Sequence, residues 1–384
     1  MATIGIIGIG HVGCALAFDL ASRGHEVILR SMPGHLGNIP KIRANNNHLG
    51  CCGVITGRLA MRVEEGLNRT TCLTETIIFV AVPSQGHDDI LAELASHDLK
   101  SRVVIFITGN AVTVRAHQVL NARVILDTAT SPYSSRVNAE GIVSIRGMKK
   151  RLQVGSLPSN ICEKDRNAVS RLFSMPLEWS PNLLDVFLSG VNGVVHVPTA
   201  LLNLGWIETT NGDFYFYRQG MSSGVCSIIE AADRERLAVA AAYHCGVRSA
   251  LETYNINYGA RERTLREFAQ NTGPHNKTKG VQRRFLSQDV PYWLVPCSEL
   301  GARAGVPTPF IDLLILLAST FGCTDYRMTG RTLQSLGLGN AATHEIITAF
   351  GGNYEVGLGR NSVLRMARKR QLPRLFWFYR GLLS

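Results

Sequence analysis

The chain has 384 residues, 45% of them hydrophobic, which is enough for a large core and for two domains. Its net charge is +11, but seven of the basic residues follow Gly359 in a tail without an acid, so the rest is only mildly basic. A mild positive excess suits an enzyme whose substrates and cofactor are anions, and we expect no nucleic-acid partner. No apolar run reaches the length of a bilayer span, so we expect no membrane partner either.

Nine cysteines occur without a C-x-x-C pair and without the spacing of metal ligands. This pattern indicates reduced thiols in a cytoplasmic protein and predicts no metal site. The apolar N-terminus lacks the basic residues that begin a signal peptide, which agrees with that location.

The first feature along the chain is a glycine-rich turn between a strand and a helix. An apolar run at 3–7 predicts a strand, G-x-G-x-x-G follows at Gly8, Gly10 and Gly13, and residues 11–23 predict an amphipathic helix. In this context the glycines are typical of dinucleotide binding, because they permit a tight turn, close approach of a pyrophosphate, and helix packing. An ordinary glycine-rich turn is the alternative. The residues expected to bind the cofactor here are Gly8, Gly10, His11, Val12 and Gly13.

The second predicted strand, 26–31, ends without the acid that usually binds the ribose of NAD. Arg30 and Ser31 occupy that place. A carboxylate would repel a 2′-phosphate, whereas a guanidinium pairs with it. The sequence therefore predicts NADPH as the cofactor, with Arg30 and Ser31 in contact with it.

Three further strands are predicted at 76–83, 102–109 and 122–130, with helical stretches between them. This alternation favours a parallel, doubly wound sheet of the Rossmann type. Ligands bind at the carboxyl ends of such strands. We therefore add Val82, Pro83 and Gly109 to the expected cofactor-binding residues.

The pattern changes near residue 180. Before it, short alternating runs predict an antiparallel addition to the sheet, followed by a helix over 162–173. After it, helical patterns dominate, at 183–206, 222–247, 249–256, 260–270, 293–304 and 308–320. We predict an α/β fold with a dinucleotide-binding domain at 1–180 and a mainly α-helical substrate and catalytic domain at 181–384.

Two polar constellations stand out in the second half. Asn192 and His196 are four residues apart in an apolar helix that Pro198 should kink, so both side chains share one face. A histidine on an apolar face is more often a satisfied core residue than a catalytic one. Arg284 and Asp289 flank a short apolar stretch before Pro291, and by themselves they would indicate a surface ion pair.

Together these motifs resemble the octopine/nopaline dehydrogenase family, the opine dehydrogenases. The likeness covers roughly residues 3–340, although Gln288 stands where the family usually has Glu and the tail after Gly359 has no counterpart. The segment at 128–138 is similar to the opine synthases of crown-gall bacteria. Further matching segments are "DRERLAVAAA" (233–242), "GVPTP" (305–309) and "GRTLQSLGL" (330–338).

The resemblance implies an opine synthase that condenses an amino acid with a 2-oxo acid and reduces the resulting C=N bond with NADPH. His196 would act as base and acid, Asp289 would orient its imidazole, and Asn192 would hydrogen-bond the oxo acid or the cofactor amide. Arg284 would bind a substrate carboxylate. Pyruvate and 2-oxoglutarate both stay open as the oxo acid, and 2-oxoglutarate would need a second cation.

Two other classes remain open. One is a 2-oxo or 3-hydroxy acid reductase that needs no amine, and the other is a dinucleotide-sensing protein without catalysis. The three residues His196, Asp289 and Arg284 together argue against the sensor. The basic tail at 360–384 contains an aromatic cluster, which suits a subunit contact or an anionic membrane surface, and a disordered tail is the alternative. We favour the subunit contact and hence a homo-oligomer.

Overall fold

The structure, a computed structural model, describes residues 3–32, 34–67, 75–273, 278–280 and 285–353. Residues 1–352 form one contact unit, and 353–384 form a second, of which only Asn353 is described. The expected contact through the tail at 360–384 therefore lies outside the described residues and stays a prediction.

The main sheet has eight strands, and six of them are parallel in the order β5-β2-β1-β6-β7-β8. Its parallel strands are β1 (Thr3–Ile7), β2 (Glu26–Ser31), β5 (Arg62–Glu65), β6 (Ile77–Val80), β7 (Val103–Ile107) and β8 (Val124–Thr128). The chain winds outward from β1 in one direction and then from β6 in the other. This order is the doubly wound Rossmann arrangement, so the predicted fold class is confirmed.

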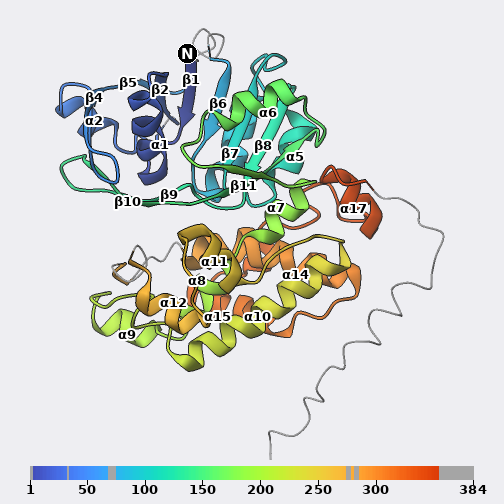
Figure 1. The fold of residues 1–384 in the computed structure, drawn as a ribbon. Helices are drawn as coiled ribbons and strands as arrows, with labels where there is room; N and C mark the ends of the chain where they lie inside the picture. Colours follow the sequence, from blue (N-terminus) through green and yellow to red (C-terminus); the bar gives the residue numbers. More distant parts are fainter. Residues whose placement is uncertain (1–2, 33, 68–74, 274–277, 281–284, 354–384) are drawn as a thin grey trace, which may run out of the picture. The chain divides into compact units, whose positions relative to one another are not determined.

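The strand sequences explain why both faces of this sheet are covered. Every residue of β6 and β7 is buried, as expected for parallel strands with helices on each face. Ile77 and Phe79 pack in one core cluster and Ile78 and Val80 in another, because successive side chains point to opposite faces. The helices of this half are α1 (His11–Ser22), α2 (Ile39–Ala44), α4 (His87–Leu94), α5 (Val112–Val119) and α6 (Glu163–Ser170), with the short η1 (Ser84–Gly86) (Figure 1).

The antiparallel addition is divided between two sheets. β11 (Leu152–Leu157) pairs antiparallel with β8 and carries β12 (Leu177–Trp179) at the edge of the main sheet. β10 (Val143–Met148) instead belongs to a second sheet of order β4-β3-β10-β9, with β3 (His48–Gly53), β4 (Gly57–Ala60) and β9 (Tyr133–Val137). β3, β4, β5, β9 and β12 were not predicted from the sequence.

The helical half begins after β12. Its elements are α7 (Leu183–Ser189), α8 (Asn192–Leu201), α9 (Leu204–Thr209), α10 (Ser223–Ala242), α11 (Ala250–Tyr258), α12 (Leu265–Asn271), η2 (Phe285–Leu294), α14 (Val295–Ala304), α15 (Pro309–Gly322), α16 (Tyr326–Thr329) and α17 (Thr343–Ala349) (Figure 1). The change from strands to helices occurs between Trp179 and Leu183. A domain boundary at residue 180 nevertheless stays a prediction, because residues 1–352 form one contact unit.

The continuous helix expected over 183–206 is wrong, because the chain breaks it into α7, α8 and α9. The first break is at Gly190, where a Cβ atom would lie 2.8 Å from the Trp293 ring nitrogen. Among the described residues, Leu183–Leu201 is the one stretch apolar and long enough to cross a membrane, so the expectation that no run has this length is also wrong. Since 94% of its most apolar window is buried, we interpret it as core.

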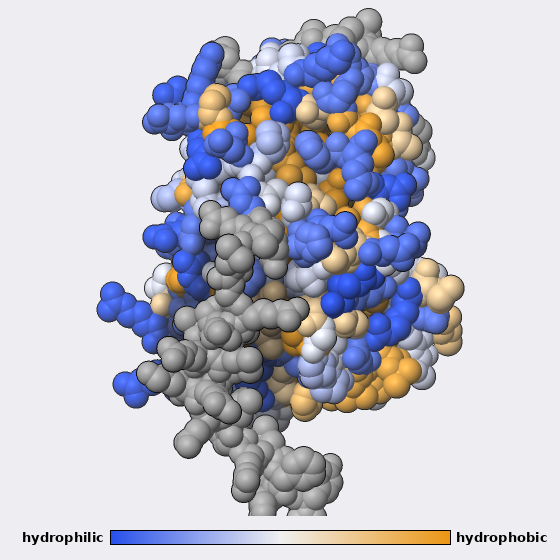
Figure 2. Space-filling view, turned by 90° about the vertical axis from the view of Figure 1, so that its right-hand side faces the viewer, coloured by the Kyte–Doolittle hydropathy of each residue, from blue (hydrophilic) through white to orange (hydrophobic). Residues whose placement is uncertain are grey.

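The surface is mixed in character. On the face shown in Figure 2, hydrophilic residues predominate and hydrophobic residues gather in separate patches. Along α15, Leu313, Leu316 and Phe321 are about half exposed or more. Such apolar residues suit a protein contact, and self-association of this chain stays a prediction.

Candidate active site

The turn after β1 has the geometry that a dinucleotide requires. Gly8 has φ +108°, and a Cβ atom there would lie 2.6 Å from the carbonyl oxygen of Ala81. A Cβ at Gly13 would lie 1.8 Å from the Gly8 oxygen, so α1 can pack this closely only on glycine. A Cβ at Gly10 would meet no atom within 4 Å, which leaves room for a pyrophosphate at the N-terminus of α1. The residues present therefore fit a dinucleotide.

His11 and Val12, in the first turn of α1, both line a cavity that reaches the helical half. His11 is fixed there because its Nδ1 accepts a hydrogen bond from the backbone N–H of Val137, at 3.0 Å. This bond joins the first turn of α1 to strand β9. Contact of His11 and Val12 with the cofactor is a proposal that their place in the turn supports.

The loop after β7 is held in an unusual backbone conformation. Thr108, Asn110 and Ala111 all have positive φ, which is uncommon for residues other than glycine. The N–H of Gly109 donates to Asp127 Oδ1 at 2.7 Å. Burial raises the pKa of the Asp127 carboxyl to about 7, although the backbone N–H donors oppose that shift. The loop therefore has a rigid support at the carboxyl edge of the sheet.

A buried arginine from the distant segment after α16 also supports this loop. Arg331 donates to the carbonyl oxygens of Gly109 and Asn110, at 2.9 and 2.7 Å. After the neighbouring strand β6, Val82 and Pro83 lead into η1. Gly109, Val82 and Pro83 thus lie at the carboxyl ends of their strands, and their contact with the cofactor stays a proposal.

Arg30 does not occupy the position expected of a phosphate ligand. Its side chain is fully buried, its Nε donates to Glu75 at 2.9 Å, and its Nη1 donates to Glu64 at 2.7 Å. Arg30 alternates with Ser31 along β2, so the two side chains point to opposite faces. The expected contact of Arg30 with a 2′-phosphate is therefore wrong for this structure, because the buried Glu75 and the partly exposed Glu64 already hold the guanidinium.

The structure brings His196 and Asp289 together. Nδ1 of His196 lies 2.8 Å from Asp289 Oδ2, and its Nε2 lies 2.9 Å from the hydroxyl of Tyr217. A carboxylate accepts, so Nδ1 carries the proton, and Nε2 accepts from the Tyr217 hydroxyl. Phe285 packs on the imidazole with ring centroids 4.3 Å apart. The ring is thus fixed in one tautomer and one orientation.

Packing between α8 and η2 places these two side chains side by side. A Cβ at Gly193 would lie 2.3 Å from the Trp293 ring, so glycine lets this indole of η2 lie directly on α8. The Trp293 ring N–H donates to the carbonyl oxygen of Phe187 at 3.1 Å. η2 is a π-helical segment, a form that is often found at functional sites. Pro198 lies inside α8, eight residues after the break at Gly190.

Asn192 lines the same cavity as His196, one helical turn before it. Its side chain forms no hydrogen bond with any residue that the structure describes, so its amide is available to a ligand. Arg284 lies outside the described residues, and its role as a carboxylate ligand stays a prediction. The catalytic roles of Asn192, His196 and Asp289 are proposals that this geometry supports.

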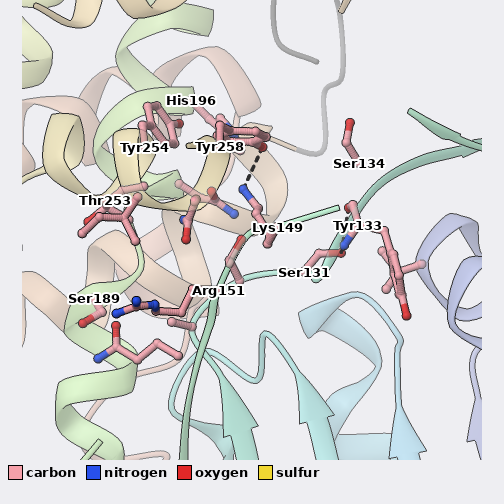
Figure 3. A pocket seen from close by; sticks show the side chains of 18 of the residues that line it. Ser131, Tyr133, Ser134, Lys149, Arg151, Ser189, His196, Thr253, Tyr254 and Tyr258 are labelled. Carbon is pink, nitrogen blue, oxygen red and sulfur yellow. Dashed lines mark hydrogen bonds between the residues drawn. The ribbon is translucent and has the colours of Figure 1, made fainter. Parts of the chain in front are cut away.

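The cavity, of about 190 Å³, is also lined by ionisable side chains that were not predicted from the sequence. Its wall includes Lys149, which follows β10, and Tyr258, at the end of α11 (Figure 3). Tyr217 was missed as well. A single lysine or tyrosine outside a motif cannot be recognised as a site residue from one sequence. Only the folded structure shows that these residues line the cavity.

Comparison with known proteins agrees with both halves of this description. Residues 3–110 match the family model "NADP oxidoreductase coenzyme F420-dependent", and residues 179–321 match "NAD/NADP octopine/nopaline dehydrogenase, alpha-helical domain". An opine dehydrogenase of Arthrobacter sp. (strain 1C) is 29% identical over 88% of this chain and 95% of its own. A vitopine synthase of Allorhizobium ampelinum is 27% identical over 92% of this chain and all of its own.

Solved structures show the same fold. An octopine dehydrogenase in complex with NADH and L-arginine superposes with a TM-score of 0.67, at 16% identity, over 92% of this chain and 99% of the other. A yersinopine dehydrogenase with NADP+ bound gives a TM-score of 0.67 at 13% identity, over 91% of this chain and 98% of the other.

The fold, the glycine turn and the helical half define an NAD(P)-dependent oxidoreductase that acts on CH–NH bonds. Such enzymes reductively condense an amino acid with a keto acid. Residues 179–321 match the octopine/nopaline dehydrogenase family, and opine dehydrogenases and opine synthases are similar to this chain over most of its length, as its motifs predicted.

Proposed function

We propose that this protein is an NADPH-dependent opine synthase that joins an amino acid to pyruvate or 2-oxoglutarate. One observation carries the proposal: the first turn of α1 and the imidazole of His196 line the same cavity. With the pyrophosphate at that turn, the nicotinamide of the cofactor would reach the substrates beside the imidazole. The cofactor supplies the hydride that reduces the C=N bond, and the chain's own residues handle the protons.

His196 can serve as the base that the condensation needs. An amino acid arrives as an ammonium ion and must lose a proton before its nitrogen attacks the oxo carbon. With Asp289 on Nδ1, the lone pair of His196 Nε2 can take that proton, once the substrate replaces the Tyr217 hydroxyl. The imidazolium can then return a proton to the hydroxyl group that leaves as water.

Asp289 supports both steps. It is buried, and its carboxylate accepts a hydrogen bond from Nδ1–H of the neutral ring and stabilises the charge when the ring is protonated. Asn192, on the same face of α8, would hydrogen-bond the oxo acid or the cofactor amide. Arg284 would bind a substrate carboxylate.

We base the proposed preference for NADPH on the end of β2 at Ser31 rather than on Arg30. Residues 32–37, which follow β2, contain no carboxylate that would repel a 2′-phosphate. Ser31 ends β2, and its hydroxyl forms no hydrogen bond with the described residues. NADH remains the alternative cofactor.

The decisive experiment measures NADPH oxidation with an oxo acid in the presence and absence of added amino acids. An opine synthase requires the amine, and its product contains a new secondary amine that mass spectrometry detects. Oxidation at the same rate without any amine would instead identify a 2-oxo acid reductase. A panel of amino acids crossed with pyruvate and 2-oxoglutarate would then identify the substrates.

A further inference from the structure

Lys149 is a buried cation on the wall of the cavity. It is 8% exposed, and its Nζ donates to the hydroxyl of Tyr258 at 2.7 Å (Figure 3). The ammonium also lies 3.9 Å from the centre of the Tyr258 ring. The backbone on either side is fixed, since Lys149 N–H donates to Pro132 and Lys150 N–H donates to Asn257. The position of this charge is therefore built into the fold.

No carboxylate among the described residues forms an ion pair with Lys149. Burial raises the pKa of Tyr258 far above its ordinary value, so this partner is a neutral phenol. Glu178, which also lines the cavity, lies 2.7 Å from Arg248 and 3.7 Å from Arg151. The other acid beside the cavity, Asp289, is engaged by His196. A buried ammonium with a neutral partner is costly unless a ligand supplies the missing charge.

Burial accordingly lowers the pKa of Lys149 to about 7. A carboxylate bound next to the ammonium would raise that pKa again, because an opposite charge favours the protonated form. Burial is the main cause of the raised pKa of Tyr258, and the nearby Tyr217, which hydrogen-bonds His196, raises it further.

We infer that Lys149 and the hydroxyl of Tyr258 bind a carboxylate of the substrates, an inference that rests on the proposed reductive condensation. Both substrates of that reaction carry a carboxylate, and 2-oxoglutarate carries a second one. The ammonium donates to one carboxylate oxygen, while the Tyr258 hydroxyl, which now accepts from Lys149, turns its own proton toward the ligand. Lys149 is thereby a binding residue that selects anionic substrates.

The test compares Lys149→Met with the control Lys150→Met. Methionine has a similar length and no charge, and a buried methionine does not endanger the fold. Lys150 is the adjacent residue, it is exposed, and its loss removes the same formal charge. Lys149→Met should raise the KM of one substrate about ten- to a hundredfold with a smaller change in kcat, whereas Lys150→Met should change neither. Tyr258→Phe, which keeps the ring, should give a smaller effect in the same direction.

Carboxamide analogues distinguish the source of the carboxylate. If Lys149 binds the α-carboxylate of the oxo acid, the penalty of Lys149→Met disappears when that acid is replaced by its amide. If the increase in KM instead disappears with the amide of the amino acid, Lys149 binds the carboxylate of the amino acid. If KM increases for 2-oxoglutarate but not for pyruvate, Lys149 binds the distal carboxylate of 2-oxoglutarate. An equal penalty for every acid and amide, or no penalty at all, would overturn the inference.

Calorimetry separates this inference from the proposed function. The 2-oxo acid and the amino acid are each titrated singly into the enzyme with NADP+ present, so no turnover is needed. Weaker binding of one of them to Lys149→Met, but not to Lys150→Met, supports the carboxylate site even if the enzyme needs no amine. Unchanged binding of both overturns it, whatever reaction the enzyme performs.

Discussion

The imidazole of His196 and the carboxylate of Asp289 are 2.8 Å apart, although 93 residues separate them in the chain. One lies on α8 and the other on the π-helical η2, and Trp293 packs these elements together on Gly193. The second ring nitrogen contacts Tyr217 at the cavity. Substitution of His196 or Asp289 should therefore measure how much each side chain contributes to proton transfer.

Asp289→Asn should lower kcat by orders of magnitude and leave NADPH binding intact, because an amide cannot stabilise the imidazolium and favours the wrong tautomer. His196→Ala should cost at least as much. Steady-state kinetics and fluorescence titration with NADPH measure the two quantities. Since the residues act as a unit, the double variant should be little worse than His196→Ala alone. Fully multiplicative losses, or normal turnover of Asp289→Asn, would contradict a catalytic pair.

Gly193→Ala should displace η2 from α8. The added methyl would lie 2.3 Å from the Trp293 ring, so we expect a stability loss of about 1–3 kcal/mol and a lower kcat as Asp289 moves from His196. Gly205→Ala, also in a helix but with no atom within 4 Å of the new Cβ, is the matched control. It should be neutral or slightly stabilising. Equal free energies of unfolding for the two variants, measured by denaturant unfolding, would contradict this packing role.

Arg30→Ala should destabilise the fold rather than weaken NADPH selectively. The change leaves Glu75 buried without its cation, and breaking a buried pair costs about 3–5 kcal/mol. Arg43→Ala removes an exposed ion pair with Glu65 and should cost at most about 1 kcal/mol. Thermal unfolding without cofactor compares the two. Normal stability of Arg30→Ala together with a selective loss of NADPH affinity would restore Arg30 as a phosphate ligand.

Ser31→Asp should shift the cofactor preference from NADPH toward NADH. A carboxylate at the end of β2 would repel the 2′-phosphate and could accept hydrogen bonds from the free ribose hydroxyls. Ser31→Asn has the same size without the charge and should keep the preference of the unmodified enzyme. The ratio of kcat/KM for the two cofactors is the measurement. An unmodified enzyme that already prefers NADH would refute the NADPH proposal.

Lys149 should make stability depend on pH. Its folded pKa of about 7 lies below the ordinary value of 10.5, so between these values the unfolded chain binds more protons than the folded one. Stability should therefore rise with pH across this window, by up to about 1.4 kcal/mol per pH unit from this group. In Lys149→Met that contribution is absent. Denaturant unfolding between pH 7 and 10 should show the difference, and parallel curves for the two proteins would exclude a buried, perturbed lysine.

Local sequence was sufficient for the cofactor turn and the class of fold. Gly8, Gly10 and Gly13 lie within six residues, and their spacing between a strand and a helix is a local pattern. The apolar runs of β1, β6, β7 and β8 predicted a parallel sheet because buried strands have this pattern wherever they occur. His196 and Asp289 were found through family motifs, since spacing alone favoured a core histidine and a surface ion pair.

Tertiary structure decided the features that depend on residues far apart in the chain. Arg30 looked like a phosphate ligand at the end of its strand, yet Glu75, 45 residues away, holds it inside the protein. Lys149 and Tyr258 meet across 109 residues, and burial of Lys149, which lowers its pKa to about 7, cannot be predicted from the sequence alone. The sequence specifies which ionisable side chains the protein has. Their hydrogen-bond partners and their burial are determined only when distant segments pack together, and both decide which ionisable group is available to a ligand.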